Sequence, residues 1–245
     1  GRVKKFNDLY NNIFSLFPFE STLLEKHSIN YTYVGHPLAK NLPTKINKED
    51  LKKDLDFPIE KKIVAILPGS RKSEIKHHDK ALVEFIEIYK KENPETLIVL
   101  ALNKESDLQG GLKEISKEIE VVFNNTQNVL AACDLAIVAS GTATLEAAIL
   151  SKPMVVIYKS NFFSNFILSN FFLKSKFIAL PNILSQEKIV FELRQNQVTG
   201  KEIYDKSVLT LKNKKNISDR LTSLRKSLLV QDSSKFSRAI QEILS

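Results

Sequence analysis

The chain has 245 residues, 43% of them hydrophobic, so it can build a globular core and is not a disordered tail. A formal charge of +8 suits phosphorylated or other anionic partners, but Lys far outnumbers Arg, and we interpret the excess as compositional bias with no nucleic-acid partner. The single Cys133 excludes an internal disulfide and is expected to be a small buried residue in a reducing compartment. No apolar run approaches the roughly 20 residues that span a bilayer, so we expect a soluble or peripheral protein. Its expected location is the cytoplasm, with peripheral contact on the inner membrane left open.

The first forty residues predict the end of an α/β unit. Val3, Phe6, Leu9 and Ile13 have helical spacing, and because this pattern is already under way at Gly1 we expect an upstream portion to be missing. A short apolar run, a helix at 20–27 and a strand at 31–34 follow. Residues 41–62, rich in Lys and Asp, predict a linker and a short helix.

Strands and helices then alternate. We expect strands at 63–67, 96–102, 120–123, 134–138 and 153–158, and helices at 77–91, 107–117, 126–133 and 142–150. Continuous Val, Ile and Leu runs separated by helices are typical of a parallel sheet covered on both faces, so the pattern predicts a doubly wound α/β fold. Beyond Pro181 the pattern predicts polar helices to the end.

A phenylalanine-rich stretch follows the last of these strands. It favours a helix packed within the fold, and the alternative is an apolar surface that binds lipid chains or a membrane interface. Its aromatic residues are Phe162, Phe163, Phe166, Phe171, Phe172 and Phe177.

Three of the chain's seven glycines, Gly35, Gly69 and Gly141, each follow a predicted strand. Ligands of open α/β sheets bind just beyond the carboxyl ends of the strands, so we expect these glycines to mark one edge. At Gly141, in the stretch ASGTATLEAA, a helix begins at Thr142, and its first N–H groups, which lack partners inside the helix, predict an anion site.

Two side chains of that stretch have competing interpretations. Glu146 lies one turn deeper on the same helix face, where it would repel a phosphate but could accept hydrogen bonds from a cis-diol such as a ribose. The pattern therefore predicts a diphosphate at the helix start and sugar hydroxyls at Glu146. The alternatives are a solvated Glu146 and an ordinary N-cap at Ser140.

The stretch LPGSRKSEI places Gly69 and Ser70 at a second strand end with Arg71 beside them. The planar guanidinium of Arg71 matches phosphate oxygens and suits a leaving diphosphate. A surface pair between Arg71 and Glu74 is the alternative, although it leaves the glycine unexplained.

Weaker signals come from His36 and Asn182. His36, at a predicted strand end, is a candidate for proton transfer or a structural residue. Asn182 follows the expected strand end FIAL, where its amide could bond ligand hydroxyls or stabilise a turn. His77 and His78 are adjacent, which does not indicate a metal site, and no cofactor is expected.

Seven short stretches, taken together and in order, closely resemble the lipid-A-disaccharide synthase family over essentially the whole chain. They are GRVKK, LFPFE, VGHPLA, LPGSRKSEI, ASGTATLEAA, PMVVIYK and LPNIL. The resemblance implies a GT-B fold with two Rossmann-like halves. Residues 1–40 would end the acceptor-side domain, 41–220 would form the UDP-sugar domain, and 221–245 would be helices that cross back.

The resemblance also implies a reaction. Such an enzyme is an inverting, metal-independent glycosyltransferase that joins UDP-2,3-diacylglucosamine to 2,3-diacylglucosamine 1-phosphate and releases UDP. Donor-binding residues carried over by motif are Gly69, Ser70, Arg71, Ser140, Gly141, Thr142, Glu146 and Asn182, with Arg71 and His36 expected at the catalytic cleft.

About the first third of such an enzyme, with its acceptor site and general base, is absent, so we expect weak UDP binding and little turnover from this chain alone. A homodimer and peripheral contact with the inner membrane are left open. The alternatives are another UDP-sugar enzyme such as an epimerase, a nucleotide-binding fragment without catalysis, and a basic RNA-binding protein.

Overall fold

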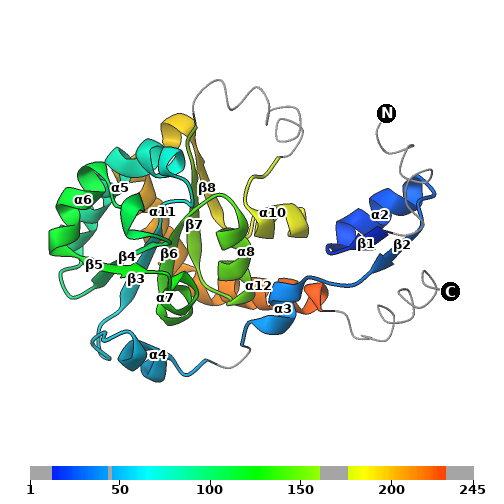
Figure 1. The fold of residues 1–245 in the computed structure, drawn as a ribbon, viewed down its shortest axis with the longest axis horizontal. Coiled ribbons are helices and arrows are strands. Elements are labelled where there is room, and N and C mark those ends of the chain that lie inside the picture. The colour runs from blue at the N-terminus through cyan, green and yellow to red at the C-terminus, as the bar shows by residue number, and fades with distance from the viewer. Residues whose placement is uncertain (1–12, 44–45, 161–175, 230–245) are drawn as a thin grey trace. The chain divides into compact units, whose positions relative to one another are not determined.

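A computed structural model describes residues 13–43, 46–160 and 176–229 (Figure 1). The chain divides into two compact units, one of Gly1–Pro43 with Ser223–Ser245 and one of Thr44–Thr222. The sequence-based division into residues 1–40, 41–220 and 221–245 stays a prediction. The assignment of the units to acceptor and donor halves stays a prediction. Residues 1–12 of the helix expected at the start and most of the phenylalanine-rich stretch lie outside the described residues. Ile13 and Phe14, the last residues of that expected helix, belong to a strand instead.

The larger unit contains a six-stranded sheet in which every neighbouring pair is parallel. Its strands are β3 (Ile63–Leu67), β4 (Leu97–Leu102), β5 (Glu120–Phe123), β6 (Leu135–Ala139), β7 (Met154–Tyr158) and β8 (Phe191–Arg194). In space their order is β5-β4-β3-β6-β7-β8. The chain thus runs outward from β3, returns, and runs outward again from β6, which places the topological switch point between β3 and β6. This confirms the predicted doubly wound α/β fold.

Helices cover both faces of this sheet (Figure 1). One layer joins α5, α6 and α11, and the other joins α4, α7, α8 and α10. Their bounds are α4 (Lys48–Asp54), α5 (Lys72–Glu92), α6 (Gly110–Ile115), α7 (Thr126–Ala132), α8 (Thr142–Ile149), α10 (Leu180–Ser185) and α11 (Gly200–Lys212). Short 3-10 turns lie at Glu105–Asp107, Ser116–Glu118 and Gln195–Gln197, and α12 (Lys214–Leu228) crosses the boundary between the units.

The core lies between the sheet and α5. All five residues of β3 and of β6 are buried, because both faces of these central strands are covered. Leu82, Phe85 and Ile86 lie on the apolar stripe of α5 and have no exposed surface. Cys133 is 2% exposed and donates its S–H to the Leu130 carbonyl, as expected of a small buried residue.

Three sequence predictions for the larger unit were wrong. Helix α5 begins at Lys72 instead of residue 77, because the Glu74 carboxylate accepts the Ser70 N–H and stabilises the first turn. Ile178 and Ala179 do not end a strand but lead into α10. The region beyond Pro181 is not entirely helical, since β8 completes the sheet beside β7.

The smaller unit begins with a βαβ arrangement, as predicted. Strand β1 (Ile13–Ser15) pairs in parallel with β2 (Tyr31–Tyr33), helix α2 (Pro18–Lys26) connects them, and α3 (Pro37–Asn41) follows. Gly35 follows β2 and therefore belongs to this two-stranded sheet, so the expectation that it shares an edge with Gly69 and Gly141 was wrong. Within the described ranges, no helix has the length and apolar character needed to cross a membrane.

Candidate functional site

A cavity of about 410 Å³ lies at the carboxyl ends of β3, β4 and β6, at the switch point of the sheet. Both glycine turns predicted from the sequence, at Gly69 and Gly141, line it. The lining residues are Leu67, Gly69, Ser70, Arg71, Glu74, Ala101, Asn103, Thr126, Ala139, Ser140, Gly141, Thr142, Ala143 and Glu146. The end of the sheet thus brings together the two stretches that the sequence singled out.

The start of α8 forms one wall of the cavity. Gly141 is the N-cap residue, with φ +153°, a conformation that L side chains rarely adopt. A Cβ built on it would meet nothing within 4 Å, so the space in front of the turn is open. Among the described residues, no acceptor is found for the N–H groups of Gly141, Thr142 and Ala143. These donors and the helix dipole together favour an anion.

Ser140 lies at the same wall but is not the N-cap, so the alternative offered by the sequence was wrong. Its hydroxyl donates to the Ile178 carbonyl at 3.1 Å, and its backbone N–H donates to the Ile157 carbonyl at 2.9 Å. Ser140 is therefore held from two sides, by β7 and by the segment that precedes α10.

Glu146 lines the cavity one turn further along α8. Burial raises the pKa of its carboxyl, and a hydrogen bond with Gln127 opposes this effect. The carboxylate is therefore partly removed from water, a position in which hydroxyl donors from a ligand would replace lost hydration.

The turn after β3 forms the facing wall. A Cβ on Gly69 would lie 2.8 Å from the Glu74 Cβ, and its φ of +132° also favours glycine. The Glu74 carboxylate accepts the Ser70 N–H at 3.0 Å and the Arg71 Nη1 at 2.6 Å. The surface pair offered as the alternative for Arg71 is therefore present, and Glu74 also explains the glycine. Because the Arg71 side chain is 76% exposed, its part in binding a diphosphate stays a prediction.

Three residues near the cavity were missed from the sequence. Asn103 and Thr126 line it, and the signal for both was their position just after the predicted strands at 96–102 and 120–123. His78 is 2% exposed, with Nδ1 2.7 Å from the Pro68 carbonyl and Nε2 3.1 Å from the Lys159 N–H. Since a backbone N–H only donates, Nε2 must be the acceptor and Nδ1 carries the proton. Burial lowers the pKa of His78, in the same direction as this neutral tautomer requires.

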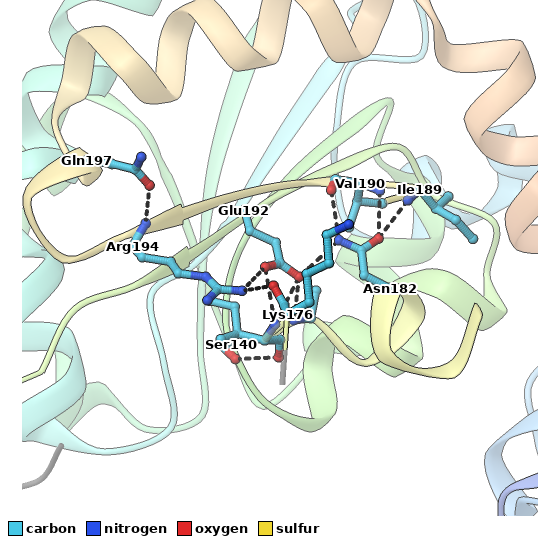
Figure 2. Close-up of polar contacts among 10 residues, drawn as sticks. Ser140, Lys176, Asn182, Ile189, Val190, Glu192, Arg194 and Gln197 are labelled. Carbon is cyan, nitrogen blue, oxygen red and sulfur yellow. Dashed lines mark hydrogen bonds and ion pairs between the residues drawn. The ribbon is translucent and has the colours of Figure 1, made fainter. Parts of the chain in front are cut away.

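Asn182 does not line the cavity. It is fully buried, and its amide nitrogen donates to the Val190 carbonyl and the Glu192 carboxylate, each at 2.9 Å. Its amide oxygen accepts the N–H groups of Ile189 and Val190 (Figure 2). With its bonds directed into the protein, Asn182 matches the turn-stabilising interpretation, and the expectation that it contacts a ligand is corrected.

His36 belongs to the smaller unit. Its Nδ1 accepts the Leu38 N–H at 3.2 Å, which caps α3, and its ring stacks on Phe17 with centroids 5.1 Å apart. Burial lowers the pKa of the ring. These contacts give His36 a structural role, and a part in proton transfer stays a prediction. In the described part of the chain, no group of three or more His, Cys, Asp or Glu side chains is arranged to hold a metal.

Solved structures resemble the fold at low sequence identity. The UDP-GlcNAc 2-epimerase of Neisseria meningitidis, bound to UDP-GlcNAc, matches with a TM-score of 0.62 and 12% identity over 94% of this chain and 60% of its own. The C-terminal domain of a group 1 glycosyl transferase from Francisella tularensis matches with a TM-score of 0.54 and 16% identity over 77% of this chain and 96% of its own. These likenesses show the fold, an α/β sheet of the GT-B type.

Sequence relatives identify the family. The lipid-A-disaccharide synthase of Dechloromonas aromatica is 33% identical over the whole chain, and that of Colwellia psychrerythraea is 34% identical, also over the whole chain. The chain spans 66% and 63% of the lengths of these relatives. A family model described as lipid-A-disaccharide synthetase matches residues 1–243, and the chain therefore belongs to this family.

Proposed function

We propose that this chain supplies the donor site of a cytoplasmic glycosyltransferase. The proposed reaction moves 2,3-diacylglucosamine from its UDP derivative to 2,3-diacylglucosamine 1-phosphate, forming lipid A disaccharide 1-phosphate and UDP. One observation carries the proposal: Gly141, Thr142 and Ala143, whose N–H groups have no acceptor in the described part of the chain, line the same cavity as the turn at Gly69. Family membership supports the choice of reaction.

The arrangement of charges supports one orientation of the nucleotide. The diphosphate belongs at the start of α8, where backbone donors and the helix dipole favour negative charge. Glu146 would repel a phosphate placed against it, but its oxygens can accept hydrogen bonds from both ribose hydroxyls. The uridine ribose is therefore assigned to Glu146 and the diphosphate to Ser140, Gly141 and Thr142.

The proposed transfer is inverting and needs no metal. The acceptor hydroxyl attacks the anomeric carbon on the face opposite the leaving group and gives up its proton to a base, while the bond from that carbon to the diphosphate oxygen breaks. Negative charge then builds on the diphosphate, where the N–H groups of α8 can stabilise it as it develops. Arg71 can join them by turning away from Glu74. No general base is assigned within this chain, and a homodimer and membrane contact stay predictions.

Calorimetry with UDP, UMP and uridine tests the site. UDP should bind most tightly and uridine least, because each phosphate lost removes charge-assisted hydrogen bonds worth roughly 1.5 to 3 kcal/mol. Addition of EDTA should leave the UDP affinity unchanged. Equal binding of uridine and UDP would contradict the placement of the diphosphate.

A UDP-sugar epimerase is the rival on the same fold. Product analysis with acylated and plain UDP-glucosamine donors separates the two: the proposed enzyme forms a disaccharide from the acylated donor, and an epimerase changes the sugar's configuration without an acceptor. UDP binding with neither product would favour a nucleotide-binding role without catalysis.

A further inference from the structure

Glu192 is a buried carboxylate on β8 that is bonded to the segment before α10. Its side chain is 7% exposed and extends from β8 toward the segment that precedes α10 (Figure 2). It accepts the Ile178 N–H at 3.0 Å and the Ala179 N–H at 2.8 Å. The Asn182 amide donates to it at 2.9 Å and the Arg194 guanidinium at 2.7 Å.

These hydrogen bonds stabilise the buried carboxylate of Glu192 and fix the backbone beside it. A buried carboxylate is costly unless it is paired and hydrogen-bonded, and Glu192 meets both conditions. The accepted N–H groups belong to Ala179, the N-cap of α10, and to Ile178 before it, so Glu192 satisfies backbone donors at the start of the helix. Arg194 also donates to the Lys176 carbonyl at 2.8 Å, which fixes the same segment at a second point.

The segment held by Glu192 is joined to the anion-binding turn by two hydrogen-bonded links. In the first, the Ser140 hydroxyl donates to the Ile178 carbonyl at 3.1 Å. In the second, the Leu180 N–H donates at 3.3 Å to the buried Thr144 hydroxyl, which itself donates to the Gly141 carbonyl at 2.7 Å. The first link ends at Ser140 and the second at Gly141, the two residues that begin the anion-binding turn.

We propose that Glu192 is a positioning residue for the anion-binding turn. By holding residues 178–180, it fixes the directions of Ser140 and Gly141 and so aims the N–H groups of α8 at the diphosphate. Glu192 does not itself touch the ligand. The inference rests on the proposed function for its ligand, while the mechanical coupling is a property of the protein alone.

Hydrogen exchange and UDP calorimetry on the 245-residue chain test this coupling with Glu192→Gln. The variant keeps the shape of the side chain but loses the charge and sets an amide group against N–H donors. Exchange at Ala179 should rise, and exchange at Ser140 and Thr144 should rise with it by about tenfold, since local opening becomes easier. UDP affinity should fall about tenfold, the loss expected for one misplaced charge-assisted hydrogen bond.

Glu187→Gln is the matched control. Glu187 also pairs with an arginine, at 2.6 Å from Arg220, but it is 60% exposed, on the surface before β8. This variant should leave the exchange at Ser140 and Thr144 and the UDP affinity unchanged. In a Ser140→Ala background, Glu192→Gln should raise exchange at residue 140 by less than in the wild type, because the link through the Ser140 hydroxyl is already broken, while the effect at Thr144 should persist through the link from Leu180.

Each result decides the proposal. Faster exchange at Ala179 with unchanged exchange at Ser140 and Thr144 would reduce Glu192 to a cap for α10 and overturn the inference. If Glu192→Gln does not fold, Glu192→Asp takes its place, because it keeps the charge and shortens the side chain. It must raise exchange at Ala179, Ser140 and Thr144 together, by a smaller factor. If the wild type fails to bind UDP, the proposed function fails, and the exchange comparison still decides the coupling.

Discussion

Gly69 and Gly141 both line the cavity and both have a positive φ, but packing excludes a side chain only at Gly69. At Gly69 an added Cβ would collide with Glu74, so packing behind the turn requires the glycine. At Gly141 there is open space, and the backbone conformation alone disfavours a side chain. An added methyl at Gly141 would thus extend into open space in front of the turn instead of displacing the protein.

Gly141→Ala should therefore weaken UDP binding at least tenfold, because a methyl would separate the phosphate from a charge-assisted hydrogen bond. It should also cost about 1 to 3 kcal/mol of stability through backbone strain. Gly110→Ala is the control, since Gly110 also has a positive φ of +60° but does not line the cavity. Calorimetry and urea unfolding check both variants, and an equal loss of UDP affinity in both would contradict the local role of Gly141.

We expect the Glu146 carboxylate to lower the stability of the protein at neutral pH and to strengthen UDP binding. Because burial raises the pKa of its carboxyl, the folded state holds the proton more tightly than the unfolded state, and stability falls as the pH rises above the unfolded value of about 4.3. Glu146→Gln should remove that fall and stabilise the protein at neutral pH, while it weakens UDP binding. Thermal unfolding at several pH values, with UDP titrations, would measure both. A variant that lost stability and kept its UDP affinity would refute the assignment of Glu146 to the ribose.

At the scale of elements, His78 joins two strand ends that the sheet alone does not connect. It lies on α5 and bonds the backbone just after β3, at Pro68, and just after β7, at Lys159. Burial lowers its pKa; the Pro68 bond and Glu74 act in the other direction, and His77 and Lys159 act with burial. Protonation would place a hydrogen on Nε2, against the Lys159 N–H, and break this connection.

The lowered pKa of His78 sets the direction of a pH dependence. The unfolded state binds the proton more readily, so stability is complete above the unfolded value of about 6.5 and falls as the pH decreases below it. His78→Gln should flatten this dependence and cost about 1 to 3 kcal/mol at neutral pH through unsatisfied buried groups. His27→Gln, at an exposed position, should leave the dependence unchanged. Unfolding measured between about pH 5 and pH 8 checks both, and a wild-type slope in His78→Gln would disprove the role.

How far the sequence predicts this fold depends on how each element is buried. Strands β3, β4, β6 and β7 are nearly continuous apolar runs, so their burial on both faces is visible in the residue types. Strand β8 was missed because two of its four residues are Glu192 and Arg194, which are charged and pair with each other. Their other partners, in residues 176–182, lie outside the strand, and no local pattern reveals them.

The position of the cavity was predictable from the sequence, but most side-chain contacts around it were not. Gly69 and Gly141 follow recognisable strands, and strand ends of a parallel sheet share an edge, so their meeting at one cavity could be foreseen. For Asn182 and Arg71 the sequence offered both a ligand contact and an internal bond, and only the side-chain geometry shows that the internal bonds form. For the same reason His78, which follows another histidine within a helix, gave no signal of its contacts with Pro68 and Lys159.

At the scale of the whole molecule, the larger unit holds everything that the proposed donor site uses. Its sheet, its hydrophobic core and every residue that lines the cavity lie between Thr44 and Thr222. The boundary after Thr222 divides α12. The buried residues Ile217 and Leu221 stay with the larger unit. The hydrogen bond from the Ser218 hydroxyl to the Ser151 carbonyl also lies within it. The contacts of Arg225 with the carbonyls of residues 39, 42 and 43 belong to the smaller unit.

A fragment of residues 44–222 should therefore fold alone and bind UDP within about threefold of the 245-residue chain, since a compact unit with its own core can fold independently. Circular dichroism should show one cooperative thermal transition, and calorimetry should give the affinity. The same fragment with Gly141→Ala is the control that must lose binding while it keeps the transition. If the 44–222 fragment folds but does not bind UDP and the 245-residue chain does, the diphosphate site needs residues of the smaller unit, and its assignment to the β3–β6 switch point alone is wrong.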